Sequence, residues 1–304
     1  MISLVIPVYN EEDLISELFD RAISSMISIG ENFEIIFIDD GSTDRTLAKL
    51  IDCNQRDRRA KVLSLSRNFG HQAAYTAGLS HAKGEYIAMM DGDLQDPPEL
   101  IKAMFEKIVS EDVEVVFGKR TERKEKFFKR MLIKLFHKIF RKLSNLKNID
   151  QVGNFSLMSK KALSAFLSLN EKNRYLPGLR SFIGFKQGFV EYSRPDRAHG
   201  EAKMSANKLV LLAFDAIFSF SNIPVKICLY SGLFGIILIF FAVLYILIGK
   251  ISGLAPLGWS SVIISIYFIG SVQLLSIGIL GEYVFRIYKE TQNRPVFLVN
   301  KFIE

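Results

Sequence analysis

Residues 86–98 read YIAMMDGDLQDPP, an apolar run that ends on two carboxylates separated by a glycine. The run predicts a buried strand, with Asp91 and Asp93 at its end. Like charges that are half-buried repel each other unless a cation neutralises them. A hard divalent ion such as Mg²⁺ or Mn²⁺ would do so, and Gln95 can add a neutral oxygen. Taken alone, the motif is equally compatible with a strand that ends in a solvated turn.

The sequence around this stretch alternates short apolar runs with longer amphipathic segments. Strands are expected at 2–8, 34–40, 62–66, 86–91 and 113–118, and helices at 11–29, 43–57, 70–82 and 98–109. This alternation predicts an α/β domain with an open, mostly parallel sheet, whose ligands bind beyond the carboxyl ends of the strands. No GxGxxG follows the first strand and no GxxxxGK[ST] occurs, which argues against a hydride-transfer or P-loop enzyme.

The predicted strand ends are rich in charge. They read PVYNEE, DDGSTD, SRNFG, DGDLQD and GKR, so the site is acidic at three places and basic at two. Asp39 and Asp40 form a second acidic pair at a strand end, before Gly41 and Ser42. Because two acidic pairs follow two strands of one sheet, we favour a binding site over two unrelated solvated turns.

The last third of the chain is strongly apolar. Residues 225–248 and 259–285 each exceed the roughly 20 residues that cross a bilayer core. Basic residues flank their outer ends, at Lys203, Lys208, Arg286, Lys289 and Arg294. The short segment between them carries a single lysine, so both outer ends are expected in the cytosol. The alternative is a buried hairpin in a large soluble core.

A basic amphipathic helix is expected at about 126–143, where the chain reads KFFKRMLIKLFHKIFRKL. One face is aromatic and aliphatic and the other is cationic, which is typical of helices that lie in a membrane interface. An ordinary helix that covers the sheet is the alternative. The net charge of +7 also raises nucleic acid as a partner. The apolar face beside two membrane spans favours lipid, and no nucleic-acid partner is expected.

Six motifs in order resemble the inverting family-2 glycosyltransferases: PVYNEE, DDGSTD, SRNFGHQAAYTAGL, MDGDLQDPP, RAHGEAKMS and GEYVFRIYKETQNRP. More narrowly, they resemble the polyprenyl-phosphate glycosyltransferases, the group that contains bactoprenol glucosyltransferases and dolichol-phosphate mannose synthases. The resemblance covers nearly the whole chain. It implies a GT-A fold of the nucleotide-diphosphosugar transferase kind. It also implies metal-dependent transfer of one sugar from a nucleotide sugar, UDP-linked in our interpretation, to undecaprenyl phosphate or a related polyprenyl phosphate.

The resemblance also assigns roles to residues. The donor nucleotide is expected at Pro7, Tyr9, Glu11, Asp39 and Asp40, with Arg197 and Lys203 over its phosphates. The metal, Mg²⁺ or Mn²⁺, is expected at Asp91, Asp93 and Gln95, the two aspartates being the catalytic residues. The acceptor phosphate is expected at Arg120, Arg130 and Lys134, which are well placed in the sequence, before and within the basic helix, to receive it beside the metal site.

One segment departs from the resemblance. Many relatives carry an acidic residue and an arginine in a GDFRL-like segment, where this chain has Gly153, Asn154, Phe155, Ser156 and Leu157. Asp150 lies just upstream. The departure leaves the identity of the sugar open. The chain lacks the QxxRW segment of processive synthases, which favours transfer of a single sugar.

Together these features predict a bacterial plasma-membrane enzyme with both termini in the cytoplasm, making a lipid-linked sugar for cell-envelope glycans such as lipopolysaccharide. The predicted parts are a catalytic domain (1–204), a juxtamembrane interfacial helix (205–222), a two-helix transmembrane hairpin (223–286) and a C-terminal tail (287–304). Small residues in the spans favour a homo-oligomer. The alternatives are transfer to another membrane lipid, such as a diacylglycerol, and a non-catalytic nucleotide-sugar-binding scaffold.

Overall fold

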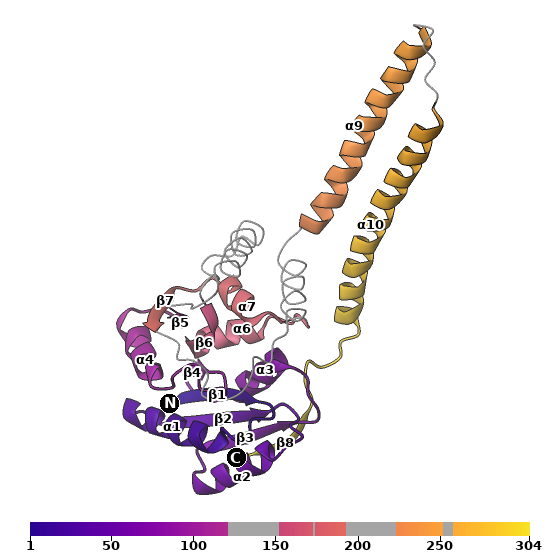
Figure 1. Cartoon of the computed structure of the whole chain (residues 1–304). Helices are drawn as coiled ribbons and strands as arrows, with labels where there is room; N and C mark the ends of the chain where they lie inside the picture. Colours follow the sequence, from indigo (N-terminus) through magenta and orange to yellow (C-terminus); the bar gives the residue numbers. More distant parts are fainter. Residues whose placement is uncertain (121–151, 173, 193–222, 252–257) are drawn as a thin grey trace. The chain divides into compact units, whose positions relative to one another are not determined.

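The computed structural model describes residues 1–120, 152–172, 174–192, 223–251 and 258–304 (Figure 1). The chain forms two compact units, Met1–Lys208 with Pro295–Glu304, and Leu209–Arg294. The basic helix expected at 126–143 and the interfacial helix expected at 205–222 lie outside the described residues.

The first unit is built on an eight-stranded sheet in the order β7-β5-β6-β4-β1-β2-β3-β8 (Figure 1). The strands are β1 (Ile2–Val8), β2 (Phe33–Asp39), β3 (Ala60–Leu65), β4 (Tyr86–Met89), β5 (Val115–Arg120), β6 (Val152–Ser159), β7 (Gln187–Tyr192) and β8 (Val299–Ile303). Parallel pairs join β1 to β2 and β4, β2 to β3, and β5 to β7, while β6 and β8 run antiparallel to their neighbours. The predicted open, mostly parallel α/β sheet is confirmed.

Helices cover both faces of this sheet. They are α1 (Ile15–Ile29), α2 (Thr46–Arg56), α3 (His71–His81), α4 (Leu100–Ser110), α6 (Lys160–Leu167) and α7 (Leu176–Phe182). Helix α1 packs with Leu4 and Ile6 of β1, whereas Gly78 of α3 packs against Val5, so α1 and α3 lie on opposite faces. All seven residues of β1 are buried, as expected for a central strand with both faces covered.

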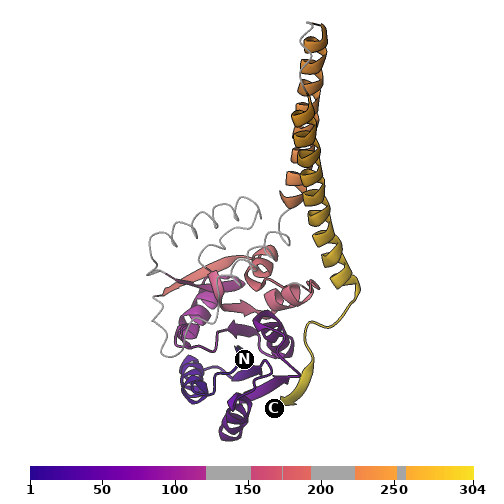
Figure 2. The same ribbon diagram turned by 45° about the vertical axis from the view of Figure 1, so that its right-hand side comes forward.

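The last residues of the chain belong to this sheet. Residues 287–304 are expected to form a tail, but Val299–Ile303 forms β8, which pairs with β3 along the sheet edge (Figure 2). The strand was missed because its pairing partner lies far away in the sequence, beyond the apolar segments.

The second unit contains two long helices that contact each other, α9 (Ile223–Ile251) and α10 (Trp259–Thr291). Helix α10 ends beyond the limit of 286 expected for the hairpin. Within the described residues, one helical segment, Ser265–Thr291, is long and apolar enough to cross a bilayer, with a mean hydropathy of 1.5. A second span through α9 remains a prediction.

Candidate functional site

Three strand ends meet at one edge of the sheet. Strand β1 lies between β2 and β4 and runs parallel to both, so their carboxyl ends share an edge. The sequence-predicted residues on this edge are Pro7, Tyr9 and Glu11 after or within β1, Asp39 and Asp40 at the end of β2, and Asp91, Asp93 and Gln95 after β4. The edge is therefore acidic on both sides of β1.

Asp40 is held by hydrogen bonds from the loop that follows β3. Its carboxylate accepts hydrogen bonds from the backbone N–H groups of Phe69, at 2.8 Å, and Gly70, at 2.9 Å. Burial raises the pKa of Asp40 above its ordinary value, although these two hydrogen bonds oppose the rise. The buried carboxylate thus fixes the position of the loop at 66–70 relative to β2.

Gly41 allows the loop to come this close. Its φ is +69°, and an added Cβ would stand 2.4 Å from the carbonyl carbon of Arg67. Any side chain here would push the 66–70 loop away from the end of β2. The glycine in DDGSTD is therefore explained by close packing of two backbones.

Asp39 joins its own turn to the neighbouring strand β3. Its Oδ1 accepts from the backbone N–H of Ser42 at 3.1 Å, and its Oδ2 accepts from the Ser64 hydroxyl at 3.3 Å. The side chain is 1% exposed. Tyr9 on the next strand end is 38% exposed, so of these two predicted donor residues Tyr9 has the accessible side chain.

Asp91 is oriented from helix α3. Its Oδ1 accepts a hydrogen bond from the hydroxyl of Tyr75, at 2.7 Å, and lies 3.1 Å from His71 Nε2. Tyr75 is fully buried, and its ring meets that of His71 edge-to-face. Neither residue is among the predicted site residues. Their i, i+4 spacing in a helix that begins directly after SRNFG could have indicated a shared face.

His71 has an unusual environment. Burial by itself lowers the pKa of its imidazole. The hydrogen bond and the charge of Asp91, with the charges of Asp40 and Asp93, outweigh burial, so the pKa is raised above its ordinary value. The His71 imidazole therefore keeps its proton to higher pH than an ordinary histidine does.

The turn that carries Asp91 and Asp93 is packed against β1. An added Cβ at Gly92 would stand 2.7 Å from Val8 Cγ1 and 3.0 Å from the carbonyl oxygen of Pro7. Asp93 Oδ1 accepts from the backbone N–H of Gln95 at 3.1 Å. The glycine between the two aspartates is therefore required for the turn to lie against β1.

These residues fit a metal that shares its ligands with a substrate. In the described part of the chain, no three His, Cys, Asp or Glu side chains are grouped closely enough to hold a metal ion. Two carboxylates and an amide suit Mg²⁺ or Mn²⁺, because such an ion takes its other ligands from substrate phosphates and water. The donor set is thus appropriate for a metal bound together with a phosphorylated substrate.

A buried arginine lies beneath the site. Arg180, on α7, is fully buried, and its guanidinium donates to the carbonyl oxygens of Gly153, at 2.7 Å, and Asn154, at 2.9 Å, and to the hydroxyl of Ser156. Burial lowers its pKa to about 10, which Asp91 partly opposes. The Arg180 guanidinium thus contacts Ser156. This is the position at which the resemblance implies an arginine.

Of the five basic residues predicted to bind phosphate, the structure describes Arg120. Strands β4 and β5 both run antiparallel to β6, so Arg120 ends β5 at the same edge as Asp91. Four other predicted residues lie outside the described residues: Arg130, Lys134, Arg197 and Lys203. Their roles remain predictions.

Comparisons with known proteins agree with this fold. The family model "Glycosyl transferase family 2" matches residues 3–167. A Bacillus subtilis protein described as an uncharacterized glycosyltransferase is 42% identical over 306 residues, covering 98% of this chain and 93% of the relative. The bactoprenol glucosyl transferase from the SfII prophage of Shigella flexneri is 37% identical, covering 99% and 97%.

A solved structure shares the fold at lower identity. It is the glucosyl-3-phosphoglycerate synthase of Mycobacterium tuberculosis, crystallised with Mn²⁺, UDP and glucosyl-3-phosphoglycerate. The TM-score is 0.51 and the identity 19%, covering 72% of this chain and 77% of that one.

Proposed function

Because this chain belongs to glycosyltransferase family 2, we propose that it transfers one sugar from a UDP-sugar to the phosphate of a polyprenyl lipid such as undecaprenyl phosphate. The observation that carries the proposal is the similarity to a bactoprenol glucosyl transferase over 99% of this chain, apolar helices included. A shared soluble domain alone would leave the acceptor open.

The donor is proposed to bind at the acidic edge of the sheet. Tyr9 offers an exposed ring for the base, while Glu11 follows the same strand and Asp40 ends the neighbouring one. Asp39 would act indirectly, because its two oxygens hold Ser42 and Ser64. Arg197 and Lys203 are proposed to close over the donor phosphates, since cations stabilise a leaving diphosphate.

Asp91 and Asp93 are proposed to hold a divalent cation together with the diphosphate, with Gln95 beside them. When bound, the cation would neutralise charge that develops on the leaving group. Tyr75 and His71 would keep Asp91 aimed at this position through its Oδ1. In this account, the two α3 residues are positioning residues.

The reaction is proposed to be a single inverting displacement. An oxygen of the lipid phosphate attacks the anomeric carbon, a carbon–oxygen bond forms to it, and the bond to the nucleoside diphosphate breaks with its electron pair. A phosphate monoester is already ionised at neutral pH, so the chain need not supply a strong general base. Orientation and charge neutralisation would provide most of the rate. Arg120, Arg130 and Lys134 are proposed to receive the lipid phosphate.

The enzyme is proposed to lie in the bacterial plasma membrane with the first unit in the cytoplasm. The segment Ser265–Thr291 supports one span, and α9 is proposed to form the other. A membrane anchor would keep the active site near a lipid acceptor whose phosphate lies at headgroup depth.

A lipid-product assay with purified protein tests the donor and the metal. The assay uses undecaprenyl phosphate and a panel of labelled UDP- and GDP-sugars, with and without EDTA. We expect one UDP-sugar to label the lipid, and the label to vanish with EDTA and in Asp93→Asn. Labelling from a GDP-sugar would overturn the UDP assignment, and undiminished labelling in EDTA would overturn the metal.

A further inference from the structure

The C-terminal strand is attached to the sheet next to the proposed donor site. In the ladder with β3, Leu65 lies opposite Val299 and Ser64 opposite Lys301, with an irregularity between them. Beyond the ladder, the backbone N–H of Ser66 donates to the carbonyl oxygen of Leu298 at 3.0 Å. The C-terminal segment therefore reaches the first residue of the 66–70 loop.

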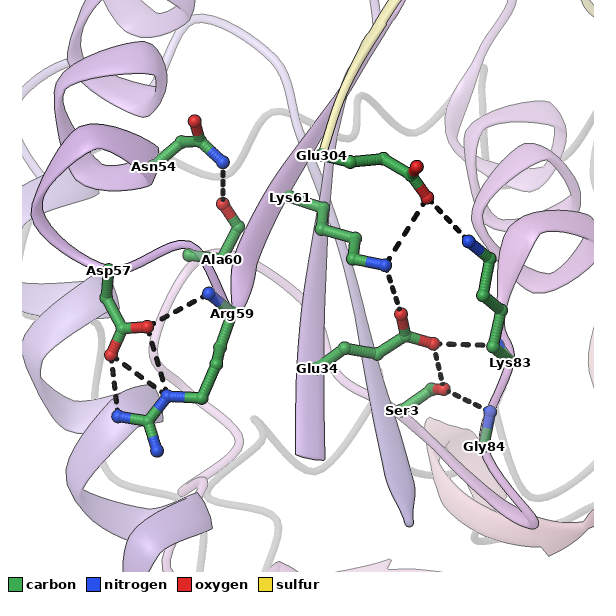
Figure 3. A network of polar contacts seen from close by, with 10 residues as sticks. All are labelled: Ser3, Glu34, Asn54, Asp57, Arg59, Ala60, Lys61, Lys83, Gly84 and Glu304. Carbon is green, nitrogen blue, oxygen red and sulfur yellow. Dashed lines mark hydrogen bonds and ion pairs between the residues drawn. The ribbon is translucent and has the colours of Figure 1, made fainter. Parts of the chain in front are cut away.

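Side chains at the other end of β8 secure the strand. The ring of Phe302 meets that of His81 at 5.2 Å between centroids, and Ile303 packs against the core. Glu304 lies 3.4 Å from Lys61 and 2.6 Å from Lys83 (Figure 3). Exposed ion pairs contribute little, so backbone pairing and the two apolar side chains carry most of the attachment.

A short series of contacts connects β8 to Asp40. Leu298 holds the amide of Ser66, the backbone of Arg67 packs against Gly41, and the next amides along the loop bind the Asp40 carboxylate. Every step uses backbone atoms of the 66–70 loop, and the last one joins two of its amides to the Asp40 side chain. The Asp40 carboxylate holds the end of the loop at Phe69 and Gly70, and the segment that leads into β8 holds its beginning at Ser66.

We infer that β8 is a positioning element of the donor site, which keeps the 66–70 loop in the conformation that binds the nucleotide. The inference rests on the proposed donor site at Asp40. Strand β8 is a short edge strand without a buried residue, so it belongs to the less stable part of the fold. Without β8, the loop must be ordered by the nucleotide, and that cost weakens binding.

The test compares the full-length protein with a variant that stops after Arg294, using UDP as the probe. We expect the Kd for UDP to rise about tenfold in the shortened protein, because the loop is no longer preordered. A synthetic peptide of residues 295–304 should restore the affinity, and a scrambled peptide should not. With the sugar donor, KM should rise while kcat changes little.

Hydrogen exchange provides a readout that needs no ligand. The amides of Ser66, Phe69 and Gly70 should exchange faster in the shortened protein, while those of α4 stay unchanged. Equal UDP affinity and equal exchange in the two proteins would overturn the inference. If the full-length protein binds no UDP, the proposed donor is wrong, and exchange at the loop still decides whether β8 orders it.

A second variant tests the inference without shortening the chain, in case the shortened protein misfolds. Phe302→Ala with Ile303→Ala keeps the chain length and removes the two apolar contacts of β8. It should show the same rise in the Kd for UDP and the same faster exchange. Glu304→Gln is the matched control, since its exposed ion pairs contribute little. Unchanged UDP binding in the double alanine variant, with faster exchange throughout β8, would overturn the coupling to the donor site.

Discussion

The hydroxyl of Tyr75 lies 2.7 Å from Asp91 Oδ1 and donates a hydrogen bond to it. Burial raises the pKa of Tyr75 well above its ordinary value, with a further contribution from the charge of Asp91, so the phenol remains a donor. A buried neutral donor thus orients the first carboxylate of the acidic turn.

Tyr75→Phe removes this hydrogen bond and keeps the ring. We expect kcat/KM to fall about tenfold, which corresponds to one lost hydrogen bond to a charged group. The Mn²⁺ concentration needed for half-maximal rate should rise, because Asp91 is less well oriented. Tyr86→Phe, at the opposite end of β4, is the matched control. If the two variants require equal Mn²⁺, the phenol does not position Asp91.

Arg180→Leu removes the guanidinium donor from the carbonyl oxygens of Gly153 and Asn154, and the Asn154 oxygen keeps only its hydrogen bond from the Ser156 hydroxyl. We expect the free energy of unfolding to fall by about 3 kcal/mol, the cost of unsatisfied buried acceptors. Adding Ser156→Arg to this variant should recover part of the loss, because the Ser156 hydroxyl already touches the guanidinium. Chemical unfolding measures the free energy of unfolding of the single and the double variant. A double variant no more stable than Arg180→Leu would contradict the account.

Gly41→Ala tests the close approach of the 66–70 loop. The new Cβ would collide with the backbone of Arg67, so Asp40 should lose its hydrogen bonds to the loop. We expect UDP affinity to fall by at least about tenfold, as for a lost charged hydrogen bond. Gly30→Ala is the control, because its φ is also positive, at +82°, but nothing lies within 4 Å of the added Cβ. Equal losses of UDP affinity would show that the collision has no effect on donor binding.

Stability should depend on pH through Glu34. Burial alone would raise the pKa of this carboxyl, but hydrogen bonds from Ser3, Lys61 and the Lys83 amide lower it below the ordinary value near 4.5 (Figure 3). A lowered folded pKa stabilises the protein above the unfolded pKa, and this stabilisation is lost as the pH falls through the folded value.

Urea unfolding of the wild type and of Glu34→Gln at a series of pH values measures this contribution. The wild type should be more stable near neutral pH, and the difference in unfolding free energy should shrink as the pH falls below about 4.5. A difference that is constant across this range would show that the charge of Glu34 contributes nothing to stability.

The sequence predicts the parts of the fold that have a local pattern. Strands β1 to β5 and helices α1 to α4 follow from alternating apolar and amphipathic segments, and the predicted family is confirmed. Strand β8 has no such signal, because its partner β3 lies more than two hundred residues earlier. Arg180 reads as an exposed helical residue, since nothing local indicates that β6 supplies its acceptors. These contacts depend on tertiary packing.

The central claim is transfer to a lipid phosphate, and a pair of acceptors tests it most directly. Purified protein in nanodiscs is given the active labelled donor with undecaprenyl phosphate, with undecaprenol, which lacks only the phosphate, or with a diacylglycerol. Mass spectrometry then identifies the product. The account predicts one hexose added to undecaprenyl phosphate and no product from the other two lipids. Glycosylated undecaprenol or diacylglycerol, formed as fast as the phosphate product, would contradict it.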